Sequence, residues 1–458
     1  MNPTRATAYG LLALDVFVSI LVFNVVVYFR GVAGGSNFLL LPLAPPIAAL
    51  FLAIYLIEGY KDRTDMLSVD YTSQHVIALV GAMLATLLLT FVVIRDGYEL
   101  QSSRSVIFFS FLTLIPLTIG YRRLIYQVQL QARGERSLVF LGDRSSCAAF
   151  RLEAEKMGTT QPVIFSVVTR ESPTTHNAQV RDELRLFNEV LDDIQENRLA
   201  VESIILPESA RELTPAISRR LVQLYFAGVP TYTLELFHQV YWQKTPLYRL
   251  NQTWLFQEGF QIAREPVFER LKRISDIVLA SLGLAFASPL IACGALAVWL
   301  NDRGPVFFFQ TRIGKNHEPF RLVKLRTMRV DPVDGDLYTQ PGDPRITRVG
   351  RFLRSSRLDE LPQMWNVLHG EMSLIGPRAE WDRLVANYQQ EIPCYHFRHL
   401  VKPGITGWAQ VKYPYGANLE DTVRKLEYDL YYIRHFSFAL DATIVLKTIH
   451  IMLFGKGR

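Results

Sequence analysis

Four long apolar segments occupy the first quarter of the chain, at about residues 11–29, 38–57, 76–94 and 106–121. Each is close to the ~20 residues that an α-helix needs to cross a bilayer. Charged side chains fall mainly at the ends of these segments, which is typical of membrane spans and not of buried helices in a water-soluble protein. We therefore expect residues 1–133 to form a four-helix transmembrane anchor.

Basic residues indicate how this anchor is oriented. Lys and Arg are more frequent beside the N-terminus, after the second segment and after the fourth segment than at the opposite ends. Because basic loops stay on the cytoplasmic side, both ends of the anchor are expected in the cytoplasm. The three cysteines are far apart and match neither a disulfide framework nor a zinc site, which agrees with a reducing compartment.

Residues 134–262 show a different pattern, in which short apolar runs alternate with helical stretches. Strands are expected at 137–141, 163–168, 204–207 and 229–233, and helices at 146–157 and 182–197. This alternation predicts a parallel, Rossmann-like α/β domain. The turn after the first strand, residues 142–147, lacks the second and third glycines of the dinucleotide fingerprint GxGxxG. A regulatory or dimerising role is therefore favoured over nucleotide binding, and we expect a homodimer.

A fifth apolar segment, residues 274–300, lies near the start of the last domain, which we place at residues 263–458. Ser288 and Pro289 lie at its middle, where proline interrupts helical hydrogen bonding and restricts the residue before it. Basic residues flank both ends, so the charge rule favours neither direction of crossing. A re-entrant helix that enters and leaves by the same face fits both observations, and a kinked ordinary span is the alternative. The stretch 438–454 is expected to be an amphipathic helix on the bilayer surface.

The whole excess of positive charge lies in this last domain. Residues 263–458 hold 27 basic and 20 acidic side chains, whereas residues 1–262 hold 22 and 23. A helix expected at about residues 345–357 has a basic face and ends just before Asp359 and Glu360. Two carboxylates near a helix start can simply favour the helix dipole. Surrounded by arginine, they also fit a site that binds a divalent metal and a diphosphate, with one carboxylate free to attack phosphorus.

Five short motifs of this domain resemble those of the bacterial polyprenyl-phosphate hexose-1-phosphate transferases, the monotopic phosphoglycosyl transferases that initiate exopolysaccharide synthesis. They are KLRTM at 324–328, RLDELPQ at 357–363, NV at 366–367, MSLIGPR at 372–378 and KPGITGWAQ at 402–410. The motifs occur in the family's order and spacing from about residue 268 onwards, which makes the signal specific. One departure is Ala379, where many members of the family have proline.

The resemblance implies a large member of that family, with a mainly helical catalytic domain and interfacial amphipathic helices. It implies transfer of a hexose-1-phosphate from a UDP-sugar, UDP-glucose first and UDP-galactose second, to undecaprenyl phosphate with release of UMP. Asp359 would attack phosphorus and carry the phosphosugar, and Glu360 would bind Mg²⁺. Four basic residues would hold phosphate oxygens: Lys324, Arg326, Arg357 and Arg378. Such an enzyme works on the cytoplasmic face of the bacterial inner membrane.

Two other classes of protein stay open. A membrane-anchored UDP-sugar dehydratase or epimerase would use the α/β domain, but it would need the complete glycine fingerprint. A non-catalytic scaffold of a polysaccharide assembly complex would need only the spans and the basic faces. We expect no nucleic-acid partner.

Overall fold

The computed structural model describes residues 3–454 apart from 31–38, 62–63, 94–103, 135, 160, 169–183, 207–212, 248–265, 330–342, 344 and 414–417. The chain divides into two compact units, Met1–Gln243 and Lys244–Arg458. The predicted domain boundary at residues 262–263 lies outside the described residues. The predicted boundary at residues 133–134 falls at the end of helix α4.

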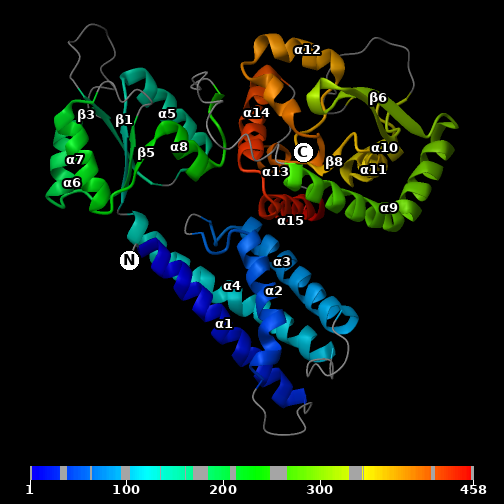
Figure 1. Cartoon of the computed structure of the whole chain (residues 1–458), viewed down its shortest axis with the longest axis horizontal. Helices are drawn as coiled ribbons and strands as arrows, with labels where there is room; N and C mark the ends of the chain where they lie inside the picture. Colours follow the sequence, from blue (N-terminus) through cyan, green and yellow to red (C-terminus); the bar gives the residue numbers. More distant parts are fainter. Residues whose placement is uncertain are drawn as a thin grey trace. The chain divides into compact units, whose positions relative to one another are not determined.

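Long apolar helices form the first part of unit 1 (Figure 1). They are α1 Pro3–Arg30, α2 Ala44–Leu56, α3 Val69–Leu88 and α4 Arg104–Gly134, with a 3-10 turn at Leu41–Leu43 and a π-helical turn at Leu89–Val93. Within the described ranges, α1, α3 and α4 are long and apolar enough to cross a membrane, as is α9 of unit 2. The prediction of a membrane-anchored protein is therefore confirmed in outline.

The second predicted span is a shorter helix than its hydropathy indicated. Helix α2 has 13 residues, or about 20 Å at 1.5 Å per residue, which is less than the ~30 Å hydrocarbon core of a bilayer. Pro45 and Pro46 occupy its first turn, where proline is tolerated, and Pro42 lies in the 3-10 turn before it. These prolines explain why the regular helix begins late.

A fully buried ion pair joins α1 to α4. Arg122 Nη2 donates to Asp15 Oδ2 at 2.6 Å, and both side chains are 0% exposed. The Tyr60 hydroxyl donates to the same oxygen at 2.6 Å, and the Tyr121 hydroxyl donates to Oδ1. A buried charge pair is best tolerated when hydrogen bonds satisfy its remaining atoms. Asp15 meets that condition, whereas Nε and Nη1 of Arg122 are buried without a hydrogen-bond partner among the described residues.

Five parallel strands form the sheet in the second part of unit 1, in the order β3-β2-β1-β4-β5. Helices α5 and α8 cover one face and α6 and α7 the other, so that β1 is buried between two apolar clusters (Figure 1). The elements are β1 Ser137–Leu141, α5 Arg144–Lys156, β2 Val163–Val167, β3 Leu184–Leu186, α6 Phe187–Gln195, β4 Val201–Leu206, α7 Pro215–Phe226, β5 Thr231–Thr233, α8 Leu234–Phe237 and a π-helical turn His238–Trp242. The predicted parallel α/β domain is confirmed.

The structure corrects the helix predicted at residues 182–197. Residues 184–186 form the edge strand β3, in which Leu184 pairs with Phe165 of β2, and helix α6 begins only at Phe187. The alternation of apolar and polar residues in Leu-Arg-Leu is typical of a strand, whereas the apolar residues from Phe187 onwards recur with the period of a helix. The sequence-based boundary merged these two patterns.

The carboxylate of Asp143 caps the N-terminus of α5. Asp143 accepts hydrogen bonds from the Ser146 amide at 3.0 Å and the Ser145 hydroxyl at 2.7 Å. The bonds from these two serines hold the pKa of Asp143 below its usual value. A phosphate at this helix start would meet a charged carboxylate, so this geometry disfavours dinucleotide binding.

Unit 2 is mainly helical, with an antiparallel hairpin β6–β7 and a short parallel pair β8–β9 (Figure 1). Its helices are α9 Pro266–Asp302, α10 Arg348–Ser355, α11 Met364–His369, α12 Asp382–Glu391, α13 Trp408–Lys412, α14 Leu419–Arg434 and α15 Phe438–Phe454. Its strands and 3-10 turns are β6 Phe307–Ile313, η10 Lys315–His317, β7 Pro319–Leu325, η11 Leu358–Gln363, β8 Ser373–Ile375, η12 Tyr395–Leu400 and β9 Gly404–Thr406.

Helix α9 bends near its middle, where Ser288 and Pro289 lie (Figure 1). Proline has no N–H, so the Ala285 carbonyl loses its usual partner four residues on. The Ser288 hydroxyl donates to that carbonyl at 2.8 Å and replaces the missing bond. Much of the outer surface of α9 is apolar and exposed, as Phe286 illustrates with 82% exposure. The predicted interruption is present, and the re-entrant path through a bilayer stays a prediction.

Candidate active site

The β6–β7 hairpin presents two cations on one of its faces. Phe308 lies opposite Lys324, and Arg312 lies opposite Phe320. Because side chains alternate along a strand, Arg312, Leu322 and Lys324 share the face that lines a pocket. Lys324 Nζ lies 5.0 Å from the centre of the Phe308 ring, which supports its position.

Asp359 and Glu360 lie in the 3-10 turn η11 and not at the start of a regular α-helix. Arg357, just before the turn, has a φ of 59°, which turns the chain sharply after α10. Helix α11 begins only after the turn and ends at Gly370, whose φ of 89° is typical of a helix end. The turn packs against β7 and α9, so both carboxylates come next to the hairpin.

The two adjacent carboxyl groups have opposite pKa shifts. Burial, and then the charge of Glu360, raise the pKa of Asp359 to about 6, while Lys324 opposes the shift. Burial also disfavours a charged Glu360, yet Arg378 and Arg357 outweigh burial and hold its pKa below the usual value. Glu360 is therefore the permanent anion of the pair, and Asp359 titrates close to neutral pH.

Asp359 is 6% exposed and makes no hydrogen bond or ion pair with any residue that the structure describes. Its carboxylate is thus buried enough to be weakly solvated and still available to a ligand. The pKa of Lys324 shifts in the opposite direction, because burial, and then the charge of Arg312, lower it to about 8. A buried carboxyl group and a titratable cation therefore lie close enough to influence each other.

Arg378 links Glu360 to Gln410 of helix α13. Its Nη2 donates to Glu360 Oε1 at 2.8 Å, and its Nη1 donates to Gln410 Oε1 at 3.3 Å. It follows β8 in a loop where a Cβ on Gly376 would lie 2.4 Å from the Lys402 carbonyl oxygen. Only glycine allows the loop to pack so closely against the segment before β9.

Three cations and one carboxylate line this pocket together with five neutral residues. The charged and amide side chains of its lining are Arg312, Lys324, Glu360, Gln363 and Arg378. Guanidinium and ammonium groups converging on one cavity suit a diphosphate, since each charged donor can bind a phosphate oxygen.

Two of the predicted phosphate-binding residues lie outside this lining. Arg326 pairs with Asp302 at the end of α9, and a Cβ on Gly304 would meet its guanidinium group. Arg357 is partly exposed, with its Nη1 3.7 Å from Glu360 Oε2. The structure brings Lys324 and Arg378 to the pocket, while a phosphate contact for the other two stays a prediction.

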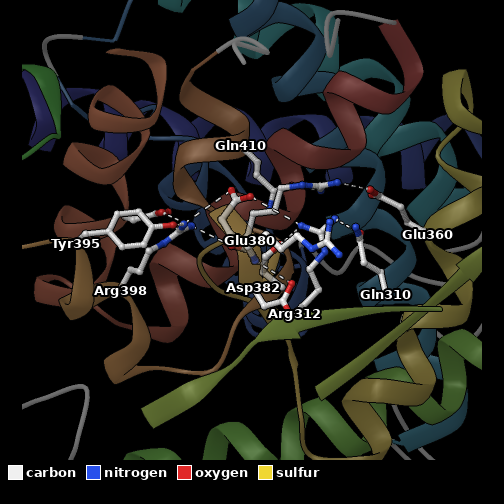
Figure 2. Close-up of polar contacts among 12 residues, drawn as sticks. Gln310, Arg312, Glu360, Glu380, Asp382, Tyr395, Arg398 and Gln410 are labelled. Carbon is white, nitrogen blue, oxygen red and sulfur yellow. Dashed lines mark hydrogen bonds and ion pairs between the residues drawn. The ribbon is translucent and has the colours of Figure 1, made fainter. Parts of the chain in front are cut away.

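A buried network holds the loop that carries Arg378 (Figure 2). Arg398 Nη2 donates to the Arg378 carbonyl oxygen at 2.9 Å, and Arg312 Nη1 donates to the Ala379 carbonyl oxygen at 2.9 Å. Glu380 lies between the two arginines, with an oxygen 3.8 Å from a guanidinium nitrogen of each. The backbone at Arg378 and at the residue after it is therefore fixed by charged hydrogen bonds.

The sequence analysis missed Arg312, Gln363, Arg398 and Gln410 as parts of this site. For Arg312 a signal existed, since strand alternation over 307–313 places it on one face with Gln310, whose Oε1 accepts from Arg312 Nη2 at 2.6 Å. Arg398 lies in the 3-10 turn η12, where no periodic pattern marks a residue as buried.

Comparison with known proteins gives a consistent match to the second unit. Residues 267–455 match the family model described as "Bacterial sugar transferase". The chain is 40% identical over 240 residues to the UDP-N-acetylgalactosamine-undecaprenyl-phosphate N-acetylgalactosaminephosphotransferase of Aeromonas hydrophila, covering 52% of this chain and 56% of the relative. It is 48% identical over 183 residues to the UDP-glucose:undecaprenyl-phosphate glucose-1-phosphate transferase of Escherichia coli strain K12, covering 39% of each.

The matched stretch covers 56% and 39% of the lengths of these two relatives. A third relative is matched over more of its own length. This is the UDP-glucose:undecaprenyl-phosphate glucose-1-phosphate transferase of Caulobacter vibrioides, 42% identical over 185 residues, which are 40% of this chain and 69% of the relative. The pocket lined by Glu360, Lys324 and Arg378 lies wholly within the matched residues, as does Asp359, which is next to Glu360 but outside the lining. The chain therefore belongs to the bacterial sugar transferase family.

Proposed function

We propose that this chain transfers a hexose-1-phosphate from a UDP-sugar to undecaprenyl phosphate and releases UMP. The observation that carries the proposal is Asp359, a buried carboxylate without a partner among the described residues, beside a pocket lined by three cations. A weakly solvated carboxylate is a better nucleophile than one in water, and the cations would offset the charge of a diphosphate. The printed names of the relatives supply the two substrates.

In the first step, an Asp359 oxygen attacks the β-phosphorus of the UDP-sugar. The bond from that phosphorus to the bridging oxygen breaks, and UMP leaves with the bridging oxygen. The phosphosugar is then bound to Asp359 as an acyl phosphate. Lys324, Arg312 and Arg378 line the pocket in which the charge of the departing UMP develops, so they would stabilise that step.

In the second step, a phosphate oxygen of undecaprenyl phosphate attacks the same phosphorus. The Asp359–phosphorus bond breaks, the carboxylate is regenerated, and the lipid carries a diphosphate-linked sugar. Dividing the transfer in this way avoids bringing two bulky anionic substrates into one pocket together. Glu360, held by Arg378, stays charged throughout because its pKa is low.

The residues present fit a Mg²⁺ ion in this pocket. Mg²⁺ is commonly bound by one or two carboxylates together with waters and substrate phosphates. Glu360 offers a charged carboxylate beside Asp359, at a pocket with room for phosphate. When bound, the ion would neutralise diphosphate charge and so allow attack by an anion. Glu360 is the residue we assign to it.

The same proposal places the catalytic unit at the cytoplasmic face of the bacterial inner membrane. Its support is the bend at Ser288 and Pro289 and the exposed apolar surface of α9, which suit a helix that enters and leaves the bilayer by one face. The parallel sheet of unit 1 would be a Rossmann-like regulatory or dimerising domain of a homodimer. A dehydratase or epimerase is disfavoured by the Asp143 cap, and a pure scaffold by the unpartnered Asp359.

Product analysis tests the reaction. Purified full-length protein is given undecaprenyl phosphate, Mg²⁺ and a UDP-sugar labelled on the β-phosphate. Label in the lipid fraction with release of UMP supports the proposal, whereas release of UDP means ordinary glycosyl transfer and contradicts it. A panel of UDP-glucose, UDP-galactose and UDP-N-acetylgalactosamine decides the sugar, for which UDP-glucose is our first expectation.

Cysteine labelling tests the topology. Cys293, the exposed native cysteine, is replaced by serine, and Glu318→Cys then places a thiol at an exposed position after α9. The re-entrant path predicts that a membrane-impermeant reagent labels this thiol only after the cells are opened. A cysteine introduced within residues 31–38, which the basic residues predict to be on the outer side, is the positive control. Labelling of Glu318→Cys in intact cells would mean that α9 is an ordinary span.

A further inference from the structure

A second pocket in unit 2 is lined by charges that the proposed reaction does not use. It lies between the first turns of α9, strand β8 and the end of α14, and shares no lining residue with the catalytic pocket. Its charged lining is Glu269, Lys272, Arg273, Asp276, Lys315 and Lys402. Its apolar lining is Ile375, Val401, Tyr432 and Phe436.

The acidic groups at this pocket are already engaged by protein partners. Lys315 pairs with Glu269, and Lys272 pairs with Asp441. Asp276 accepts two hydrogen bonds from the start of β8, at 3.0 and 3.1 Å. Glu269 and Asp276 also act on the charge of Lys402. The lining nevertheless holds four cations against these two carboxylates, so its net charge is positive.

Arg273 and Lys402 are the lining cations that form no direct ion pair with a carboxylate among the residues that the structure describes. Arg273 donates to the neutral carbonyl groups of Val367 and Leu368. Lys402 makes no hydrogen bond or ion pair with a described residue. A Cβ on Gly370 would lie 3.4 Å from Arg273 Nη2 and 3.6 Å from Lys402 Nζ, so both cations lie close to Gly370. Burial and then the charge of Arg273 lower the pKa of Lys402.

Two positive charges held close together favour the binding of an anion that contacts both. A phosphate group suits the pair, because its oxygens accept charged hydrogen bonds from a guanidinium and from an ammonium group together. A free phosphate ion would use only the charged half of the lining. The apolar half, and the exposed apolar residues Val267, Leu271 and Phe438 on the adjoining ends of α9 and α15, suit the chains of an amphiphile.

We propose that this pocket binds the phosphate group of a bilayer phospholipid. The lipid would join the start of α9 to the segment around Lys402, and so fix the orientation of the catalytic unit on the membrane surface. The proposal rests on this pocket alone and is independent of the reaction proposed above.

Lipid-dependent thermal stability tests this site in the full-length protein. The protein is purified in a detergent without phosphate, and its unfolding temperature is followed as phosphatidylglycerol is added. Binding to the native state raises the unfolding temperature by mass action. Diacylglycerol, which lacks the phosphate, and inorganic phosphate, which lacks the chains, are the matched probes. Undecaprenyl phosphate is a fourth probe.

Three variants locate the effect. Lys402→Gln removes the unpaired charge, Lys402→Arg keeps it, and Arg383→Gln removes an exposed cation on α12 as a control. We expect phosphatidylglycerol alone of the first three probes to stabilise the wild type. Lys402→Gln should require about ten times more phosphatidylglycerol for half of the shift, since losing one charged hydrogen bond weakens binding by about that factor. Lys402→Arg and Arg383→Gln should behave like the wild type.

Several outcomes would overturn the proposal. Equal shifts in the wild type and Lys402→Gln would mean that the lipid binds elsewhere. A shift with inorganic phosphate alone would assign the pocket to a free anion, and a shift with diacylglycerol would make it a purely apolar contact. Stabilisation by undecaprenyl phosphate and not by phosphatidylglycerol would assign it to the acceptor substrate.

Discussion

Arg378 donates to Glu360 through a 2.8 Å contact between Nη2 and Oε1, and among the described residues no comparable cation contacts the neighbouring Asp359. This difference in contacts gives two carboxyl groups that are adjacent in the chain opposite pKa shifts. Glu360 is held charged, whereas burial raises the pKa of Asp359 to about 6. Environments that push two pKa values apart commonly divide catalytic roles, and here they divide the metal-binding and nucleophilic roles that we propose.

The rate of UMP release should depend on pH as a bell-shaped curve. Asp359 must be ionised to attack, so kcat/KM should fall about tenfold per pH unit below a pKa of about 6. Lys324 must be protonated to bind phosphate, so kcat/KM should also fall above a pKa of about 8. Initial rates at low UDP-sugar concentration from pH 5 to 9.5 measure both limbs. A flat profile over this range would exclude Asp359 as the nucleophile.

Lys324→Arg should move only the alkaline limb of that curve. Arginine stays protonated throughout the accessible pH range, so kcat/KM should no longer fall between pH 8 and 9.5. The acid limb should keep its midpoint near pH 6, because Asp359 still faces a cation. If the alkaline limb persists in this variant, a group other than Lys324 causes it. Arg383→Gln, an exposed cation on α12, serves as the control.

Asp359→Asn should abolish phosphosugar transfer and yet stabilise the folded protein at pH 7.5. A carboxyl whose pKa is raised by folding, from 3.8 to about 6, contributes stability at low pH that is lost as the pH rises through 6. At pH 7.5 the charged group therefore costs up to about 3 kcal/mol, which the neutral amide removes. Thermal unfolding at pH 7.5 and pH 5 measures this, and the gain should be smaller at pH 5. Full activity in this variant would contradict the mechanism.

Much of this architecture follows from local sequence patterns. Apolar period and length predicted α1, α3 and α4, and the Ser288–Pro289 pair predicted the interruption in α9. Helix α15 has the predicted bounds, Phe438–Phe454. The short strand β3 was missed because alternation over only three residues is a weaker signal than the helical pattern of the residues that follow.

The catalytic pocket was only partly predictable, and the reason is physical. Asp359 and Glu360 stand out because acids are rare in a basic stretch. Arg398 acts through a backbone carbonyl 20 positions away in the chain, and such a contact leaves no local pattern. Whether a basic residue reaches the pocket, as Lys324 does, or pairs elsewhere, as Arg326 does with Asp302, depends on tertiary packing.

Arg378→Gln should shift the pH profile as well as lower the rate. Arg378 lowers the pKa of both Glu360 and Asp359, so its loss should move the acid limb above pH 6. Loss of one charged contact to the diphosphate should also raise KM by about tenfold or more. The measurement is the full profile of kcat and KM, with Arg383→Gln as the matched control. A lower kcat with an unchanged acid limb would mean that Arg378 does not act on the carboxyl pair.

Asp15→Asn should destabilise unit 1, since it leaves the fully buried Arg122 without its carboxylate. Breaking a buried ion pair from one side typically costs about 3–5 kcal/mol, which corresponds to an unfolding temperature lower by roughly 6–20 °C. The double variant Asp15→Asn, Arg122→Met should be less destabilised than either single variant, because no unpaired charge remains. Thermal unfolding of the full-length protein in detergent measures all three. Strictly additive losses would show that the two side chains do not depend on each other, and the structure places them 2.6 Å apart with no exposure to solvent.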